Sequence, residues 1–158
     1  MSIKLFVMDV DDTLTDGHIY FGDNGEMFKA FHVRDGYAIA HIFPVYGIIP
    51  VIITGKSSEI VARRSKELKI NEVYQGISDK LTKLKEIADK YNVTPEEIAY
   101  IGDDVNDLDC MEYCGLTACP ADALDEVLDK VNYVCKRDGG RGAVREFADY
   151  VIETYYNN

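Results

Sequence analysis

The sequence has no tryptophan, only four prolines, and no apolar stretch that approaches the roughly 20 residues a membrane-spanning helix needs. Its first residues also lack the basic segment followed by an apolar one that marks a secretory signal. These absences predict a protein without membrane partners and with a cytoplasmic location. The chain has 158 residues, the size of one domain, so we expect a single domain over 1–158.

Positive charge is scarce. Lysine and arginine number 17 against 28 aspartates and glutamates, which gives a formal net charge of −11. Such a surface repels the phosphate backbone of nucleic acids and argues against a polyanionic partner. A small anionic substrate would have to be met by a local cluster of basic side chains.

The four cysteines, Cys110, Cys114, Cys119 and Cys135, contain no C-x2-C pair. Structural zinc sites and disulfide frameworks have spacings that this set does not show. We therefore expect reduced cysteines that pack in the interior.

Short apolar runs recur along the chain, at 3–8, 50–54, 72–75 and 98–102. Helix-like segments are expected at about 34–46, at 57–68, at 79–91 and at about 106–114, and a last strand within 132–137. Alternation of buried strands with helices predicts an α/β fold, a doubly wound parallel sheet of the Rossmann type. In such sheets the chemistry lies beyond the carboxyl ends of the strands.

One segment, 18–31, breaks this rhythm. Its apolar runs flank Asn24-Gly25, which favours a β-hairpin that projects from the domain. A two-stranded ribbon is marginally stable alone, so its large apolar side chains predict packing on another subunit. The alternative is that the hairpin folds over its own domain.

Acidic residues gather at the ends of two of the predicted strands. Asp9, Asp11 and Asp12 follow the first strand, and Asp103, Asp104 and Asp107 follow the strand at 98–102. Carboxylates this close repel one another unless a cation lies among them, and Mg²⁺ prefers oxygen ligands. A loop of solvated acids is the alternative, and Asp104 or Asn106 could simply cap the next helix.

Two further positions fit a phosphate-binding crevice. Thr54 ends the second strand, where a hydroxyl and neighbouring N–H groups could hold phosphoryl oxygens. Lys80 begins a helix, where a cation is unfavourable to the helix dipole. An anion in the crevice would explain this lysine, although a plain surface lysine is the commoner case.

Taken in order, Asp9-x-Asp11-x-Thr13, Thr54, Lys80 and Gly102-Asp103-Asp104-x-x-Asp107 resemble the four motifs of the haloacid dehalogenase superfamily of aspartyl phosphatases. Further segments resemble the 3-deoxy-D-manno-octulosonate 8-phosphate (KDO 8-phosphate) phosphatase subfamily, namely 15–17, 31–36, 53–56, Arg64, 74–76, 79–80 and 139–146. Three positions depart from it: Asp12-Thr13 replaces a frequent Gly-Val, and Lys56 replaces a frequent Arg. A sibling group that acts on nine-carbon sialic-type acids, such as 2-keto-3-deoxynononic acid 9-phosphate, stays open as an alternative.

The resemblance implies a mechanism. Asp9 would be the nucleophile and Asp11 the general acid and base. Asp9, Asp103 and the backbone carbonyl of Asp11 would bind Mg²⁺. Thr54 and Lys80 would hold the transferring oxygens, while Asp107 and Asp104 would orient Lys80 and metal-bound water.

Substrate recognition, on the same resemblance, falls on one set of residues: Asp11, His32, Val33, Arg34, Asp35, Gly36, Lys56, Arg64, Lys80 and Arg141. Arg141 and Arg145 would belong to a C-terminal lid element of the same or a neighbouring subunit. Arg34 or Arg64 could instead be surface ion-pair partners.

The spacing of the motifs leaves no room for an inserted cap domain. Neither the gap from Asp9 to Thr54 nor that from Thr54 to Lys80 can hold about 50 additional residues. The resemblance implies instead a homotetramer, in which hairpins form a central barrel and neighbours cover each other's sites. A two-component receiver domain and a non-catalytic interaction module are the rival hypotheses, but the order of the motifs and the two intact acidic clusters favour an enzyme.

Overall fold

The computed structural model describes residues 1–157, and its centre is a six-stranded sheet in which all neighbouring strands are parallel. The strand order is β5-β4-β1-β6-β7-β8, which places β1 at the middle. Strands that follow β1 are added first on one side of it and then, from β6 onward, on the other, so the strand order switches between β1 and β6. The strands are β1 (Leu5–Met8), β4 (Ile49–Ile53), β5 (Glu72–Tyr74), β6 (Ile98–Ile101), β7 (Leu116–Cys119) and β8 (Tyr133–Val134). The predicted doubly wound fold is confirmed.

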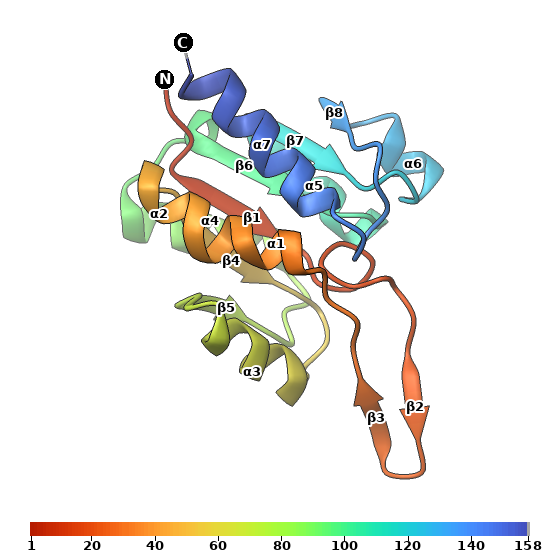
Figure 1. Cartoon of the computed structure of the whole chain (residues 1–158). Coiled ribbons are helices and arrows are strands. Elements are labelled where there is room, and N and C mark those ends of the chain that lie inside the picture. Colours follow the sequence, from red (N-terminus) through yellow and green to blue (C-terminus); the bar gives the residue numbers. More distant parts are fainter. Residues whose placement is uncertain (158) are drawn as a thin grey trace.

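Helices cover both faces of the sheet (Figure 1). One face carries α1 (Val33–Tyr37), η1 (Ala38–Ile42), α2 (Phe43–Tyr46), α3 (Glu59–Glu67) and α7 (Ala143–Tyr155). The other carries α4 (Lys80–Tyr91), α5 (Leu108–Tyr113) and α6 (Asp125–Leu128). Short 3₁₀ turns precede β6 and α5, at η2 (Pro95–Glu97) and η3 (Val105–Asp107).

The side chains of β1 show why this sheet is buried on both faces. Phe6 lies against Phe43 and Phe147, with ring centroids 4.7 and 5.2 Å away, in the core beneath α2 and α7. Leu5 and Val7 point to the opposite face, into a second core with α4 and α5. A strand with apolar residues on both sides reads in sequence as a continuous run, as 3–8 does.

The helical segment predicted at about 34–46 is continuous in space but changes its winding. Between α1 and α2 lies the wide π-helical turn η1, where the N–H of Phe43 donates to the carbonyl of Ala38. Pro44 follows at once, and proline supplies no backbone donor for an ordinary helical bond. The wider turn lets the helix run past this residue.

Three elements escaped the sequence analysis, β7, α6 and α7. The four residues of β7 include Thr117 and Ala118, a weak apolar signal, although all four are buried. The stretch that forms α7 carries an apolar face, but its glycine-rich entry at 139–142 dominates the sequence pattern.

The hairpin consists of antiparallel strands β2 (Tyr20–Gly22) and β3 (Gly25–Phe28) and projects well away from the sheet (Figure 1). A bridge between Thr15 and Phe31 closes its base. Phe21 and Met27 are 74% and 63% exposed. Within residues 1–157 no inserted cap domain interrupts the fold, and no helix has the length and apolar character to cross a bilayer.

The glycine-rich segment before α7 packs tightly on the loop after β1. The N–H of Gly140 donates to the carbonyl of Thr13 at 3.1 Å, and a Cβ added to Gly139 would lie 2.0 Å from the carbonyl oxygen of Asp12. No real side chain tolerates that approach, so only glycine fits here.

We expect Gly139→Ala to destabilise the protein, because either this segment or the loop after β1 must move. Overpacking of this kind costs about 1–3 kcal/mol, which lowers the thermal midpoint by roughly 2–12 °C in a chain of this size. Gly55→Ala is the matched control, since its Cβ would meet only the carbonyl oxygen of Ile77 at an ordinary 3.8 Å. Equal midpoints for the two variants in a thermal melt would contradict the proposed close packing.

Candidate active site

The two acidic clusters meet at the edge of the sheet where β1 and β6 lie side by side. Met8 is in register with Ile101, and the N–H of Asp9 donates to the carbonyl of Ile101 at 3.1 Å. Asp9 and Asp103 therefore leave the sheet at the same point, which is where the strand order switches from one side of β1 to the other. They line a crevice of about 550 Å³ together with Asp11, Asp12, Asp16, Gly17, His18, Thr54, Gly55, Lys56, Asp104, Asn106 and Asp122.

Lys80 lies beneath the crevice between two carboxylates. Its ammonium donates to Asp9 at 3.1 Å and to Asp107 at 2.9 Å, and all three residues are buried. Burial opposes the charge of Lys80, but Asp9 and Asp107 outweigh it and hold its pKa above the ordinary value. The position at the start of α4 thus has the anionic partners that the sequence suggested.

Asp107 is fully occupied by hydrogen bonds. One of its oxygens accepts from Lys80 and from the hydroxyl of Tyr100, and the other accepts from the backbone N–H groups of Asp103 and Asp104. A carboxylate offers about four lone pairs, so these four donors leave none for a metal ion. A Cβ at residue 102 would clash with this carboxylate at 2.4 Å, which explains the glycine of the Gly102-Asp103-Asp104 motif.

Asp9 and Asp103 are the carboxylates left to bind a cation. Oxygens of these two and of Asp107 lie within 4.8 Å of one another. Burial, and then the charge of Asp107, raises the pKa of Asp9, while burial and the neighbouring Asp9 raise the pKa of Asp103 to about 9. The buried carboxylate of Asp9 and the half-buried carboxylate of Asp103 resist ionising together, which fits a divalent cation with oxygen ligands, and Mg²⁺ is such an ion.

Other predicted residues of this edge also line the crevice. Thr54 is buried, with its N–H bonded to the carbonyl of Tyr74, whereas Lys56 is exposed. Asp104 caps η3 by accepting from the N–H of Val105. Within residues 1–157 it makes no hydrogen bond to Lys80, so of the two residues expected to orient the lysine, Asp107 contacts it and Asp104 does not.

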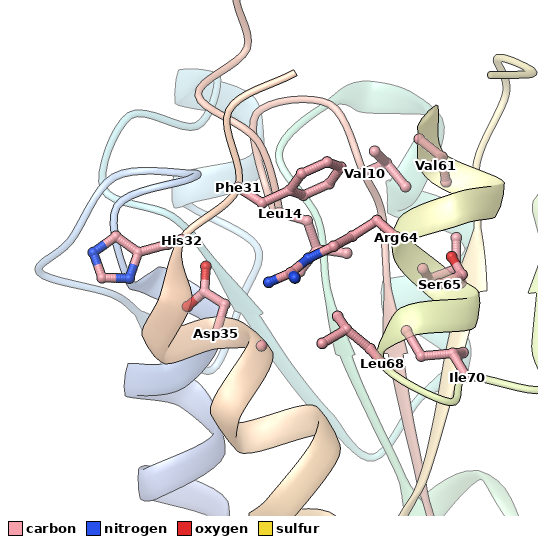
Figure 2. A pocket seen from close by; sticks show the side chains of 12 residues that line it. Val10, Leu14, Phe31, His32, Asp35, Val61, Arg64, Ser65, Leu68 and Ile70 are labelled. Atoms are coloured by element: carbon pink, nitrogen blue, oxygen red, sulfur yellow. The ribbon is translucent and has the colours of Figure 1, made fainter. Parts of the chain in front are cut away.

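Several residues predicted to bind substrate lie elsewhere, between α1 and α3 (Figure 2). Arg64 reaches from α3 towards Asp35, and its guanidinium stacks 5.6 Å from the centroid of Phe31. Burial raises the pKa of Asp35 to about 6, with Arg145 and Arg64 opposing. Arg64, Phe31 and Asp35 line a small pocket between α1 and α3. His32 and Gly36 also line this pocket, whereas Asp9 does not. The crevice of one chain therefore lacks these groups.

A second set of basic side chains lies where α1 meets α7. Arg34 and Arg145 line one hollow with Arg137, and the N–H of Arg145 donates to Asp35 at 2.9 Å. Arg141 is exposed just before α7, as Val33 is at the start of α1. None of these residues lines the crevice that holds Asp9.

Three residues of the site were missed by the sequence analysis. Thr13 donates its hydroxyl to Asp103 at 3.4 Å, and Tyr100 supports Asp107 from within β6. Lys29, at the inner end of the hairpin, donates to Asp11 at 3.2 Å. The threonine stood in the first motif and could have been assigned, but only the folded structure reveals the other two.

The fold and this set of carboxylates, with a lysine between them, define a hydrolase of the haloacid dehalogenase type. A profile of the haloacid dehalogenase-like hydrolases matches residues 49–147. The 3-deoxy-D-manno-octulosonate 8-phosphate phosphatase KdsC of Escherichia coli (strain K12) is 43% identical over 151 residues, which cover 96% of this chain and 80% of the relative.

Solved structures agree. The crystal structure of 3-deoxy-D-manno-octulosonate 8-phosphate phosphatase from Yersinia pestis matches with a TM-score of 0.92 and 43% identity, covering 96% of this chain and 81% of the other. The enzyme from Moraxella catarrhalis, in complex with magnesium ion, phosphate ion and KDO, matches with a TM-score of 0.93 and 39% identity over 98% and 88% of the two chains.

The chain belongs to the haloacid dehalogenase-like hydrolase family. Within it, the predicted resemblance to the KDO 8-phosphate phosphatase subfamily is confirmed, and with it the prediction of a phosphatase. Mg²⁺ is the cofactor that this donor set fits, in agreement with the magnesium ion of the Moraxella catarrhalis relative.

The raised pKa of Asp103 predicts how Mg²⁺ and pH act together. Without metal, Asp103 of the folded protein keeps its proton up to a pKa of about 9, whereas the unfolded chain loses it at the ordinary aspartate pKa of about 4. The stability of the folded state therefore falls as pH rises from about 4 to about 9. Mg²⁺ needs both carboxylates ionised, and it removes this loss. We expect the rise in thermal midpoint on adding Mg²⁺ to be larger at about pH 8.5 than at about pH 6.

Asp103→Asn should abolish this Mg²⁺-dependent rise, whereas Asp109→Asn, an exposed carboxylate on α5, should keep it. The measurement is a thermal melt of each protein in Mg²⁺ and in a chelator. A rise that is independent of pH, or that survives in Asp103→Asn, would contradict the metal site.

Proposed function

We propose that this chain, acting as one domain over residues 1–158, hydrolyses the phosphomonoester of a sugar acid phosphate. The substrate we propose is 3-deoxy-D-manno-octulosonate 8-phosphate. The observation that carries the proposal is the buried Asp9 carboxylate, held by Lys80 and facing Asp103 at the open crevice. The identity of 43% to phosphatases named for this substrate supports the choice of sugar.

The first step is attack by a carboxylate oxygen of Asp9 on phosphorus. The bond between phosphorus and the sugar oxygen breaks, and Asp11 gives its proton to that oxygen as it leaves. The product of this step is an aspartyl-phosphate on Asp9 and a free sugar acid. Covalent catalysis divides one difficult displacement into two easier ones.

The second step frees the enzyme. Asp11, now ionised, takes a proton from a water molecule whose oxygen attacks the phosphorus. The bond between phosphorus and the Asp9 oxygen breaks, so inorganic phosphate leaves and Asp9 is restored.

The surrounding residues make the attack of one anion on another feasible. Lys80 favours the ionised form of Asp9, and Thr54 with Lys56 lines the wall on which the phosphoryl oxygens would lie. When bound by Asp9, Asp103 and the carbonyl of Asp11, Mg²⁺ would supply positive charge that lessens the repulsion between carboxylate and phosphate.

The test is a phosphate-release screen with Mg²⁺ across sugar acid phosphates. We expect the eight-carbon 8-phosphate to be turned over fastest. The nine-carbon 9-phosphate is the alternative substrate, because Lys56 stands where the subfamily often has arginine. Faster turnover of the nine-carbon compound would make that compound the substrate in place of the eight-carbon one. No release from any of them would refute the proposed function.

Asp9→Asn removes the nucleophile while keeping the shape of the side chain. We expect phosphate release to fall at least about 10³-fold while the fold is kept, because no other group can form the covalent intermediate. Asp109→Asn, on the exposed face of α5, is the matched control and should keep wild-type turnover. Substantial turnover by Asp9→Asn in the same assay would refute the nucleophile.

We further propose a homotetramer in the cytoplasm, in which neighbouring chains complete each crevice. The exposed apolar side chains of the hairpin, Phe21 and Met27, support association because such surface is costly in water. Association would also explain how His32, Val33, Arg34, Asp35, Gly36, Arg64 and Arg141, which lie outside the crevice of their own chain, come to serve a substrate.

Phe21→Asp with Met27→Asp should therefore reduce the mass measured by sedimentation equilibrium, since charges would be buried at the contact. Val45→Asp is the matched control: Val45 is 75% exposed on α2, at the far side of the domain from the hairpin (Figure 1). An unchanged mass for the double variant would contradict association through the hairpin.

A further inference from the structure

Lys29 is a lysine whose side chain is removed from water. Only 5% of that side chain is exposed, although it belongs to the inner end of a projecting hairpin. Its ammonium donates to Asp11 at 3.2 Å and to Glu26 at 3.1 Å. Burial opposes its charge, but the two carboxylates outweigh this effect and hold its pKa above the ordinary value. The cation is therefore retained because it has two anionic partners.

Glu26, the second partner, is itself fixed to the body of the domain. Its other oxygen accepts from the hydroxyl of Ser58 at 2.6 Å. Ser58 caps α3, and its N–H donates to the side chain of Gln75 at 2.8 Å. Lys29 thus stands in a chain of contacts that runs from the loop after β1, through the hairpin, to the start of α3.

Asp11 depends on this lysine for its orientation. Its side chain is 41% exposed, and within residues 1–157 Lys29 is the only side chain that bonds to its carboxylate. An aspartate that transfers a proton must lie within about 2.6–3.2 Å of the oxygen it serves. A half-exposed carboxylate without a partner would spend much of its time in other rotamers.

We propose that Lys29 is a positioning residue that holds Asp11 for proton transfer; the inference rests on the proposed function. Lys29 donates to oxygen Oδ1 of Asp11, which makes that oxygen an acceptor and leaves Oδ2 to carry the proton. Lys29 does not touch Asp9, whose own lysine is Lys80. Each of the two carboxylates that react thus has a separate lysine that fixes it.

The arrangement also gives the hairpin a role in the chemistry of its own chain. Lys29 follows β3 directly, so the docking of the hairpin on the domain sets the position of the ammonium. Displacement of the hairpin would release Asp11 while leaving Asp9, Lys80 and Asp107 in place.

The test replaces Lys29 with methionine, which keeps an unbranched side chain one atom shorter and removes the ammonium. With Mg²⁺ and the best sugar acid phosphate of the screen, we expect kcat to fall about tenfold or more, with KM within about threefold, because proton transfer by a placed group is worth about 10²–10⁴ in rate and only part of this is lost. Lys29→Arg should recover most of kcat, since it restores a donor to Asp11.

Lys4→Met is the matched control, since Lys4 also pairs with a glutamate, Glu97 at 2.8 Å, but at the opposite end of β1. A merely structural ion pair at Lys29 would change the thermal midpoint without a selective loss of kcat that arginine reverses, and Lys4→Met should keep wild-type kcat. If Lys29→Met does not fold, Lys29→Gln is compared with Lys29→Arg by the same criteria.

The outcomes separate the two proposals. Wild-type kcat in Lys29→Met or Lys29→Gln, or equal losses in the arginine and the uncharged variants, would overturn the role of Lys29 and leave the proposed function intact. A wild-type protein that releases no phosphate from any sugar acid phosphate would overturn the proposed function, and the role of Lys29 with it.

Discussion

The structure depends on the compensation of buried negative charge at the ends of β1 and β6. Asp9, Asp103 and Asp107 converge where two parallel strands leave the sheet, and Lys80 neutralises only part of their charge. Asp107 is satisfied by four donors, so the unresolved repulsion lies between Asp9 and Asp103. A cation relieves this repulsion, and the same charge is what a carboxylate needs in order to approach a phosphate.

The remaining elements place groups around this charged centre from distant parts of the chain. The glycine-rich segment at 139–142 packs against the loop after β1, and the hairpin brings Lys29 to Asp11 in the same loop. Neither element belongs to the six-stranded sheet, and each holds the loop through close packing and hydrogen bonds. A net charge of −11 makes the placement of each cation important, and the side chains of Lys80 and Lys29, which bind Asp9 and Asp11, are both withdrawn from water.

Basic groups for an anionic substrate divide into two sets in one chain. Lys56 lines the crevice and Lys80 lies beneath it, whereas Arg64 lies between α1 and α3, and Arg34 and Arg145 lie where α1 meets α7. A single copy therefore has the groups for phosphate chemistry but few for a sugar acid. In the proposed tetramer, contacts of the exposed hairpin would bring the second set to a neighbour's crevice.

The fold class and the position of the acidic clusters can be predicted from the sequence alone, because local patterns of apolar and polar residues indicate buried strands and where they end. The alternation of apolar runs with helical segments predicted the doubly wound sheet, and the acids after 3–8 and 98–102 predicted that Asp9 and Asp103 meet at one edge. The hydrolase class followed from the resemblance of the four motifs to the haloacid dehalogenase superfamily. The strand β7 has too weak an apolar signal to be predicted. Of the two residues expected to orient Lys80, Asp107 bonds to it, whereas Asp104 caps η3. Tertiary structure alone decided that Asp107 is saturated, that Tyr100 and Lys29 serve the site, and that Arg64 faces Asp35. The reason is physical: whether two side chains distant in sequence meet depends on how loops and helices pack, and no local pattern encodes that distance.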